Sequence, residues 1–270
     1  MRVALALWLA GYGGALAARP QAEDKSQTAP AKELNAGGDK DKRYFLMGPK
    51  GGGKPPKEGY GLVLVMPGGD GSAEFQPFIK RVYQNAVPTG FLVAQMVAVK
   101  WTPDQEIVWP TKRTSVEGQK FTTEEFLEAV VADVKKRHPL DARRVFTLSW
   151  SSGGPAAYAA SLAEPTSVCG SFIAMSVFKP ERLKLANAKG QAYYLLHSPQ
   201  DQVCPIRFAR AAAATLKQRG ASVKLDEYEG GHGWHGDVFG EIKTGLQWLL
   251  TISKSVPAST QSATTRPRDQ

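Results

Sequence analysis

Apolar residues occur in short blocks along most of the chain, and longer amphipathic stretches separate these blocks. The block 62–66, Leu-Val-Leu-Val-Met, is apolar at every position and is followed directly by Pro67. Continuous apolar runs of this length are typical of strands that are covered on both faces in a parallel sheet. The pattern predicts strands over 44–47, 62–66, 91–99, 144–148, 171–177, 193–196 and 223–228.

The amphipathic stretches between these blocks carry the signals of helix ends. One stretch begins at Thr122 and has basic residues in its last turn, and another is closed by Gly220. We predict helices over 73–85, 122–137, 154–163, 206–219 and 237–252. Strands that alternate with helices indicate an α/β fold, in which a doubly wound, mostly parallel sheet has helices on both faces. Functional loops of such a sheet lie at the carboxyl ends of its strands.

The two ends of the chain differ in composition from its centre. Arg2 precedes an apolar run that leads to a small-x-small cleavage site at 15–17, so we predict a cleaved signal peptide over 1–18 and a secreted or periplasmic location. The run is too short and glycine-rich for a good membrane span, and an uncleaved anchor is the alternative interpretation. We expect a flexible linker over 19–42, one domain over 43–253 and a disordered tail over 254–270.

Composition and charge exclude some classes of function for this chain. Apolar residues make up 42% of the 270 residues, which is enough for the core of one large domain. The net charge of +9 is scattered as single lysines and arginines rather than gathered in a stripe, which argues against a nucleic-acid partner. Cys169 and Cys204 fall at opposite ends of neighbouring predicted strands, about 20 Å apart. A disulfide needs Cα atoms within about 7 Å, so we expect two thiols, and neither is a candidate nucleophile.

The segment 145–154, Val-Phe-Thr-Leu-Ser-Trp-Ser-Ser-Gly-Gly, joins a predicted strand to a predicted helix. Ser151 lies between Ser149 and Gly153 in a small-x-Ser-x-Gly turn, which is the context of a nucleophile elbow. Small residues two positions before and after the serine let the strand and the helix approach closely. The helix that follows directs its first N–H groups at a developing oxyanion.

Two features of this segment leave alternatives open. Ser149 stands where a glycine is usual. Ser152 is an alternative nucleophile because Gly154 follows it by two residues, although bulky Trp150 would then occupy the crowded position before it. Without a catalytic role, the segment would be a Ser/Gly-rich turn between a strand and a helix.

Candidates for an acid and a base follow two later strands. Asp201 lies just beyond the strand predicted over 193–196, and His232 lies in Gly-Gly-His-Gly after the last predicted strand. His235 and, less favourably, His197 are alternative bases. A serine hydroxyl needs a base to remove its proton, and the base needs a carboxylate that orients the imidazole. Serine, acid and base occur here in the chain order of an α/β-hydrolase triad.

The strand predicted over 62–66 ends in the glycine-rich loop Pro-Gly-Gly-Asp-Gly-Ser. Such a loop can donate a backbone N–H to an oxyanion. We predict that the donors are the N–H groups of Gly69 and Ser152, with Gly68 or Asp70 as alternatives to Gly69. The loop could instead be a simple strand-to-helix turn.

These motifs resemble the α/β-hydrolase superfamily over roughly residues 43–252. They are most similar to its small carboxylesterase, phospholipase and dienelactone-hydrolase branch. The resemblance implies hydrolysis of a small-molecule or polymer-linked carboxylic ester through an acyl-serine intermediate, without a metal or an organic cofactor. The short stretch 177–193 implies that a large cap domain is absent. A serine peptidase or amidase on the same fold, and a non-catalytic carbohydrate- or surface-binding protein, remain alternatives.

Aromatic residues are frequent near the predicted sheet edge. We hypothesise that they line a cleft for an aryl, acyl or sugar group, and ordinary packing is the alternative. The residues concerned are Trp101, Trp109, Trp150 and Trp234.

Overall fold

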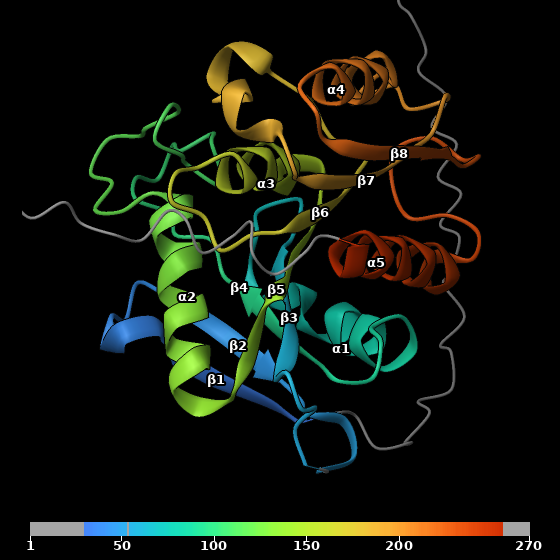
Figure 1. Cartoon of the computed structure of the whole chain (residues 1–270). Helices are drawn as coiled ribbons and strands as arrows, with labels where there is room; N and C mark the ends of the chain where they lie inside the picture. The colour runs from blue at the N-terminus through green and yellow to red at the C-terminus, as the bar shows by residue number, and fades with distance from the viewer. Residues whose placement is uncertain (1–29, 53, 256–270) are drawn as a thin grey trace, which may run out of the picture.

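The computed structural model describes residues 30–52 and 54–255, which form one mostly parallel sheet with helices on both faces (Figure 1). The eight strands lie in the order β1-β2-β4-β3-β5-β6-β7-β8. Strands β3 to β8 are parallel, while β1 and β2 pair in antiparallel fashion at one edge. The strands are β1 (Ala31–Asn35), β2 (Arg43–Met47), β3 (Tyr60–Met66), β4 (Phe91–Met96), β5 (Leu140–Trp150), β6 (Gly170–Ala174), β7 (Ala192–His197) and β8 (Ser222–Glu227).

Helices connect the parallel strands and cover both faces of the sheet. The α-helices are α1 (Gln76–Asn85), α2 (Thr123–Arg137), α3 (Gly154–Ser161), α4 (Arg207–Gln218) and α5 (Val238–Ser255). The 3-10 helices are η1 (Ala36–Gly38), η2 (Lys50–Gly52), η3 (Ala73–Phe75), η4 (Ser151–Gly153), η5 (Pro180–Arg182) and η6 (Leu185–Ala188). In Figure 1, α2, α3 and α4 lie on one side of the sheet and α1 and α5 on the other.

The continuous apolar run of β3 is explained by two separate cores. Leu62 and Leu64 pack into the core beneath α2, α3 and α4, whereas Val63 and Val65 pack into the core beneath α1 and α5. Successive side chains of a strand point to opposite faces, so a strand covered on both faces tends to be apolar at consecutive positions. The predicted α/β architecture is thus confirmed.

The start of α2 confirms the helix start that the sequence predicted at Thr122. The hydroxyl of Thr122 accepts a hydrogen bond from the backbone N–H of Glu125, and the Glu125 carboxylate accepts one from the backbone N–H of Thr122. This reciprocal pair satisfies two N–H groups that a helix end leaves without an intrahelical partner.

Two predicted boundaries need correction. Helix α5 runs to Ser255, two residues into the disordered tail that we predicted over 254–270, whose remaining residues lie outside the described part of the chain. We expected a flexible linker over 19–42, but residues 31–35 form β1 and residues 36–38 form η1. The short strand β1 pairs along its whole length with β2 at the edge of the sheet and exposes most of its side chains. Of its side chains, only Leu34 and Ala31 pack against the two cores, and its backbone pairing with β2 leaves little trace in the apolar pattern.

Further predictions concerned a membrane span, a signal peptide and the two cysteines. None of the helices among the described residues has the length and apolar character needed to cross a bilayer. The signal peptide predicted over 1–18 lies outside the described residues. Cys169 and Cys204, both described, form no disulfide, as expected. Burial, with a smaller effect of Asp201, raises the pKa of the Cys204 thiol to about 11, so this thiol stays protonated near neutral pH.

Candidate active site

Ser151 occupies a strained turn between β5 and α3. Its φ is 49°, in the left-handed region that costs a residue with a side chain about 1–2 kcal/mol. The hydroxyl of Ser176, just beyond β6, donates a 2.7 Å hydrogen bond to the carbonyl oxygen of Ser151. The neighbouring strand therefore helps to hold the turn in a conformation that exposes the Ser151 side chain at the carboxyl end of the sheet.

Small residues surround the turn because the backbone segments approach each other closely. A Cβ atom at Gly153 would lie 2.2 Å from the carbonyl oxygen of Met66, far inside contact distance. Ser149, which stands where a glycine is usual, is fully buried, and its hydroxyl lies 3.5 Å from the carbonyl oxygen of Phe172. The position thus tolerates a small polar side chain that can find a buried acceptor.

The close approach at Gly153 leads to a prediction about stability. Gly153→Ala should lower the free energy of unfolding by about 2 kcal/mol or more, because the added methyl group forces β3 and the turn apart. Urea unfolding followed by tryptophan fluorescence measures the change. Gly170→Ala is the matched control, since the shortest contact of its Cβ, at 3.0 Å, would be with the end of the Leu249 side chain, and its backbone neighbour, the Ala192 carbonyl oxygen, lies at an ordinary contact distance of 3.4 Å. Equal losses in the two variants would contradict the interpretation.

Three side chains from separate parts of the chain form one hydrogen-bonded series. The Ser151 hydroxyl lies 3.1 Å from Nε2 of His232, and Nδ1 of His232 lies 2.9 Å from a carboxylate oxygen of Asp201. A carboxylate accepts, so Nδ1 carries the proton, and Nε2 is left as the acceptor for the serine hydroxyl. The Asp201 side chain is fully buried, whereas that of His232 is 23% exposed.

The carboxylate of Asp201 is fixed from several sides. Its Oδ1 accepts hydrogen bonds from the backbone N–H groups of Val203 and Cys204, at 2.9 and 2.7 Å. Its Oδ2 faces His232 and also lies 3.3 Å from Nε2 of His197, an imidazole that is only 2% exposed. His197 Nε2 also hydrogen-bonds the carbonyl oxygen of Cys204, which can only accept, so this nitrogen carries a proton. His197 therefore donates this proton to the Cys204 carbonyl oxygen, and its ring packs beside the Asp201 carboxylate.

The loop that carries His232 is tied to the body of the protein. The hydroxyl of Tyr228 lies 3.1 and 2.8 Å from the carbonyl oxygens of Gly231 and Gly233 and donates to this pair. These two glycines flank the histidine at φ values of 85° and 130°, which side chains rarely tolerate. His235, the alternative base, instead stacks against the Tyr228 ring, 6.3 Å between centroids.

The glycine-rich loop after β3 meets the serine turn through Ser152. The Ser152 hydroxyl donates a 2.8 Å hydrogen bond to the carbonyl oxygen of Gly69. This bond connects residues that are 83 positions apart and places the Gly69 loop beside the first turn that follows Ser151. It also occupies the hydroxyl that was the alternative nucleophile, whereas the Ser151 hydroxyl faces an imidazole.

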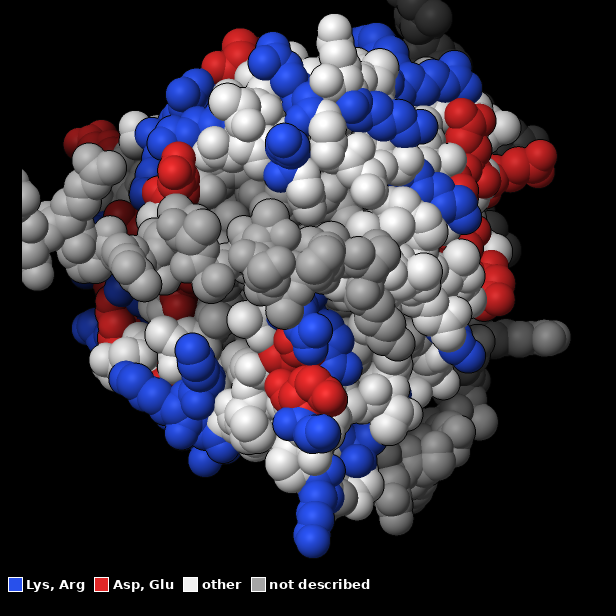
Figure 2. All heavy atoms as spheres, viewed as in Figure 1, with Lys and Arg blue, Asp and Glu red and all other residues white. Residues whose placement is uncertain are grey.

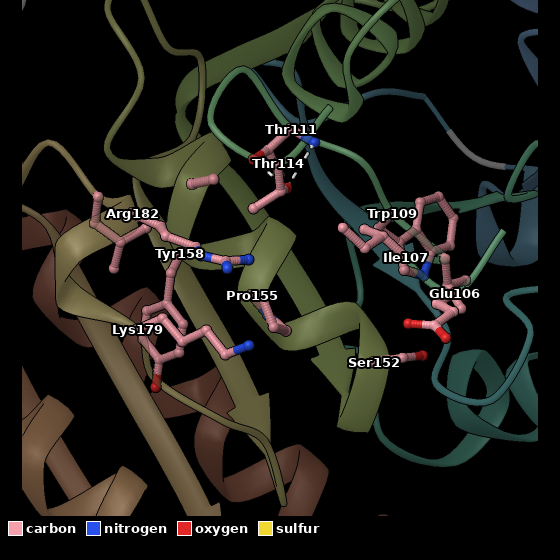
Figure 3. Close-up of a pocket in the computed structure, with 13 residues that line it drawn as sticks. Glu106, Ile107, Trp109, Thr111, Thr114, Ser152, Pro155, Tyr158, Lys179 and Arg182 are labelled. Carbon is pink, nitrogen blue, oxygen red and sulfur yellow. Dashed lines mark hydrogen bonds between the residues drawn. The ribbon is translucent and has the colours of Figure 1, made fainter. Parts of the chain in front are cut away.

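A pocket of about 180 Å³ opens beside Ser152, and Trp109 contributes to its wall (Figure 3). The indole N–H of Trp109 donates a 2.9 Å hydrogen bond to the carbonyl oxygen of Pro67, which fixes this ring next to the glycine-rich loop. Trp101, which is half-buried, packs against the same core as Trp109 and meets Phe121 edge-on, 5.0 Å between ring centroids.

Trp150 and Trp234 lie on the other face of the sheet. Their rings meet edge-on, 5.7 Å between centroids, and both also contact Phe78 of α1. The structure therefore does not gather the four tryptophans into one cleft, and of the four only Trp109 lines the pocket beside Ser152. The sequence pattern indicated the sheet edge near which these residues occur, but not the face to which each ring points.

The sequence reasoning missed residues that hold the site without lying in its motifs. Ser176, Tyr228 and the contact between His197 and Asp201 were not anticipated. Only His197 had a usable signal, because a histidine at a strand end, four residues before Asp201, lies at the same sheet edge.

Comparison with solved structures shows that other proteins share this fold. The chain is similar to a carboxylesterase from Mesorhizobium loti, with 17% identity and a TM-score of 0.59 over 83% of this chain and 99% of that one. It is similar to a Bacillus cereus carboxylesterase, with 16% identity and a TM-score of 0.57 over 77% and 93%. A thermophilic esterase from Thermogutta terrifontis, solved with propionate, matches at 15% identity and a TM-score of 0.59 over 85% and 96%.

A family model supplies evidence that the fold alone does not. The model of the phospholipase/carboxylesterase family matches residues 87–250, more than half of the chain. The matched range contains Ser151, Asp201 and His232, whereas Gly69 lies before it. On this match, together with the shared fold, the chain belongs to the phospholipase/carboxylesterase family.

Proposed function

We propose that the protein is an exported serine hydrolase that cleaves carboxylic esters, with Ser151 as nucleophile, His232 as general base and Asp201 as the acid that orients it. The observation that carries the proposal is the series of two hydrogen bonds, 3.1 Å from Ser151 to His232 and 2.9 Å from His232 to Asp201. Membership of the family supports ester hydrolysis as the reaction.

The first half of the proposed reaction forms an acyl-enzyme. The Ser151 oxygen attacks the carbonyl carbon of the ester while its proton passes to Nε2 of His232. The buried Asp201 carboxylate stabilises the resulting imidazolium and keeps its Nδ1–H in place. When the tetrahedral intermediate collapses, the bond to the alcohol oxygen breaks, and the alcohol leaves with the proton from Nε2.

We assign the oxyanion donors to the backbone N–H groups of Ser152 and Gly69. Ser152 lies in the first turn after Ser151, where N–H groups lack intrahelical partners. The Gly69 carbonyl oxygen points to the Ser152 hydroxyl, and in a trans peptide the following N–H points the opposite way. The Asp70 N–H is thereby directed away from Ser152, which favours Gly69 over Asp70 as the second donor.

The second half of the reaction returns the enzyme to its first state. Water enters beside His232, which is partly exposed, and loses a proton to Nε2 as its oxygen attacks the acyl carbon. The bond to Ser151 breaks, the serine regains the proton, and the carboxylic acid leaves. Export is proposed from the apolar run and cleavage site at residues 3–17.

A covalent probe tests this proposal directly. Thermogutta terrifontis esterase 2, which has the same fold, is phosphoramylated by tabun, so an organophosphorus probe suits this kind of site. We expect a fluorophosphonate to add once per folded chain, at the peptide that contains Ser151, and to stop hydrolysis of p-nitrophenyl esters in proportion. His232→Ala should abolish labelling, whereas His235→Ala, the matched control, should retain it. Labelling of another residue, or ester hydrolysis that survives complete labelling, would contradict the proposal.

A further inference from the structure

The pocket beside Ser152 extends away from the proposed reacting atoms. It is enclosed by the first turns of α3, by the loop 106–114 and by the segment 179–183 that follows β6 (Figure 3). Because the Ser152 N–H is a proposed oxyanion donor, an ester whose carbonyl lies there would place one of its two substituents in this pocket. The pocket thus bears on which substituents the enzyme accepts.

One part of the wall is apolar and suits a hydrocarbon chain or ring. Ile107, Val108 and Trp109 come from the loop, and Leu183 comes from the segment after β6. Of these, Trp109 and Leu183 are buried members of the core beneath α2, α3 and α4, so this part of the wall is held by packing.

The segment after β6 also contributes two cations to the wall. Figure 3 shows the side chains of Lys179 and Arg182 extending from their segment with their nitrogen atoms directed toward the pocket. Among the residues that the structure describes, no carboxylate lies within ion-pair distance of either charged group. Two positive charges therefore face this space without an anion of the described chain to neutralise them.

The one carboxylate that lines the pocket lies elsewhere on its wall. Figure 3 shows Glu106 beside Ser152 and Trp109, across the pocket from Lys179 and Arg182. A negatively charged group on the substrate would be repelled near Glu106 and attracted to the two cations. The arrangement favours an anion that lies away from the scissile bond.

Basic residues around the pocket add to the attraction of anions. Lys184 and Lys189, both exposed, follow on the same segment, which also carries the exposed Glu181, and Figure 2 shows more Lys and Arg than Asp and Glu side chains over the top of the visible face and over α4. An excess of positive charge raises the local concentration of anionic ligands and their rate of encounter.

We propose that the pocket selects esters that carry a carboxylate on the substituent that enters it, and that Lys179 and Arg182 bind this carboxylate. The guanidinium group offers two parallel N–H donors that match the two carboxylate oxygens, and the ammonium group adds a point charge. The proposal rests on the proposed function, since it places the ester carbonyl at Ser151.

Matched substrates isolate the effect of charge. The p-nitrophenyl monoester of adipic acid and the same compound with its far carboxyl methylated test the acyl side. The acetates of 4-hydroxybenzoic acid and of its methyl ester test the alcohol side, with rates normalised to uncatalysed hydrolysis. The assays are run at about 0.15 M salt, where charges beyond about 8 Å are screened. In at least one pair, we expect kcat/KM of the anionic ester to be about tenfold higher than kcat/KM of its neutral partner.

Variants assign the preference to the two cations. Lys179→Gln and Arg182→Gln should each lower kcat/KM for the preferred anionic ester about tenfold, as expected for the loss of a charged hydrogen bond, and change the neutral partner less than twofold. Lys184→Gln is the control, because Lys184 is an exposed lysine of the same segment that does not line the pocket. All three positions are exposed, so folding should be unaffected.

The outcomes separate the two proposals. Hydrolysis of neutral esters as fast as anionic ones in both pairs, or a preference that survives both substitutions, would overturn the carboxylate proposal and leave the esterase proposal intact. Failure to hydrolyse any of the four esters, together with no probe on Ser151, would overturn both.

Discussion

Ser151→Ala should lower kcat for a p-nitrophenyl ester by about a million-fold, which is the scale of loss when a serine hydrolase loses its nucleophile. The residual rate would come from substrate binding and the oxyanion donors, which the substitution leaves in place. Steady-state kinetics with purified protein measures the change, and far-ultraviolet circular dichroism establishes that the variant is folded.

The neighbouring serine supplies the comparison for this experiment. Ser152→Ala removes the hydrogen bond to the Gly69 carbonyl oxygen but keeps the backbone N–H, so we expect a loss of about tenfold rather than a million-fold. A large loss in Ser152→Ala with little loss in Ser151→Ala would show that the two serines have been assigned in the wrong order.

Asp201→Asn should lower kcat by about ten-thousand-fold with little change in overall structure. Two backbone N–H groups, of Val203 and Cys204, fix an acceptor at the Oδ1 position, so the asparagine amide NH2 group must take the place of Oδ2. There it would face the Nδ1–H group of His232. His232 avoids the clash by moving its proton to Nε2, where it can no longer accept the serine proton.

The control for this substitution is an aspartate outside the site. Asp226 lies on β8, where its carboxylate is hydrogen-bonded to Tyr194, and Asp226→Asn should change kcat less than threefold. If folded Asp201→Asn retained more than a hundredth of the wild-type kcat, the orienting role of Asp201 would have to be abandoned.

The sequence predicted the parts of the fold that depend on burial and local signals. The doubly covered strand β3 is apolar from Leu62 to Met66, and α2 follows a threonine that caps it. The edge strand β1 was missed because it exposes most of its side chains and depends on backbone pairing with β2.

The residues of the site likewise include some that the sequence predicted and some that it did not. Ser151, Asp201 and His232 could be proposed from the sequence because each follows a strand, and carboxyl ends of parallel strands meet at one edge. The separation of Trp109 from Trp150 could not be predicted, since it depends on which face of the sheet each ring enters. Lys179 and Arg182 gave no signal either, because a lysine and an arginine on an exposed segment resemble any other solvated charges.

The position of His232 just beyond the terminal strand has a consequence for heat inactivation. Strand β8 pairs with β7 alone, and its side chains are exposed or only half buried, whereas β5, which carries Ser151, lies among the central strands. Native structure unfolds first where burial is lowest. Local unfolding of β8 and of the loop after it would therefore move the His232 imidazole away from Ser151, while Ser151 stayed in place on the central sheet. Enzymatic turnover should therefore cease at a lower temperature than the one at which the central layers melt.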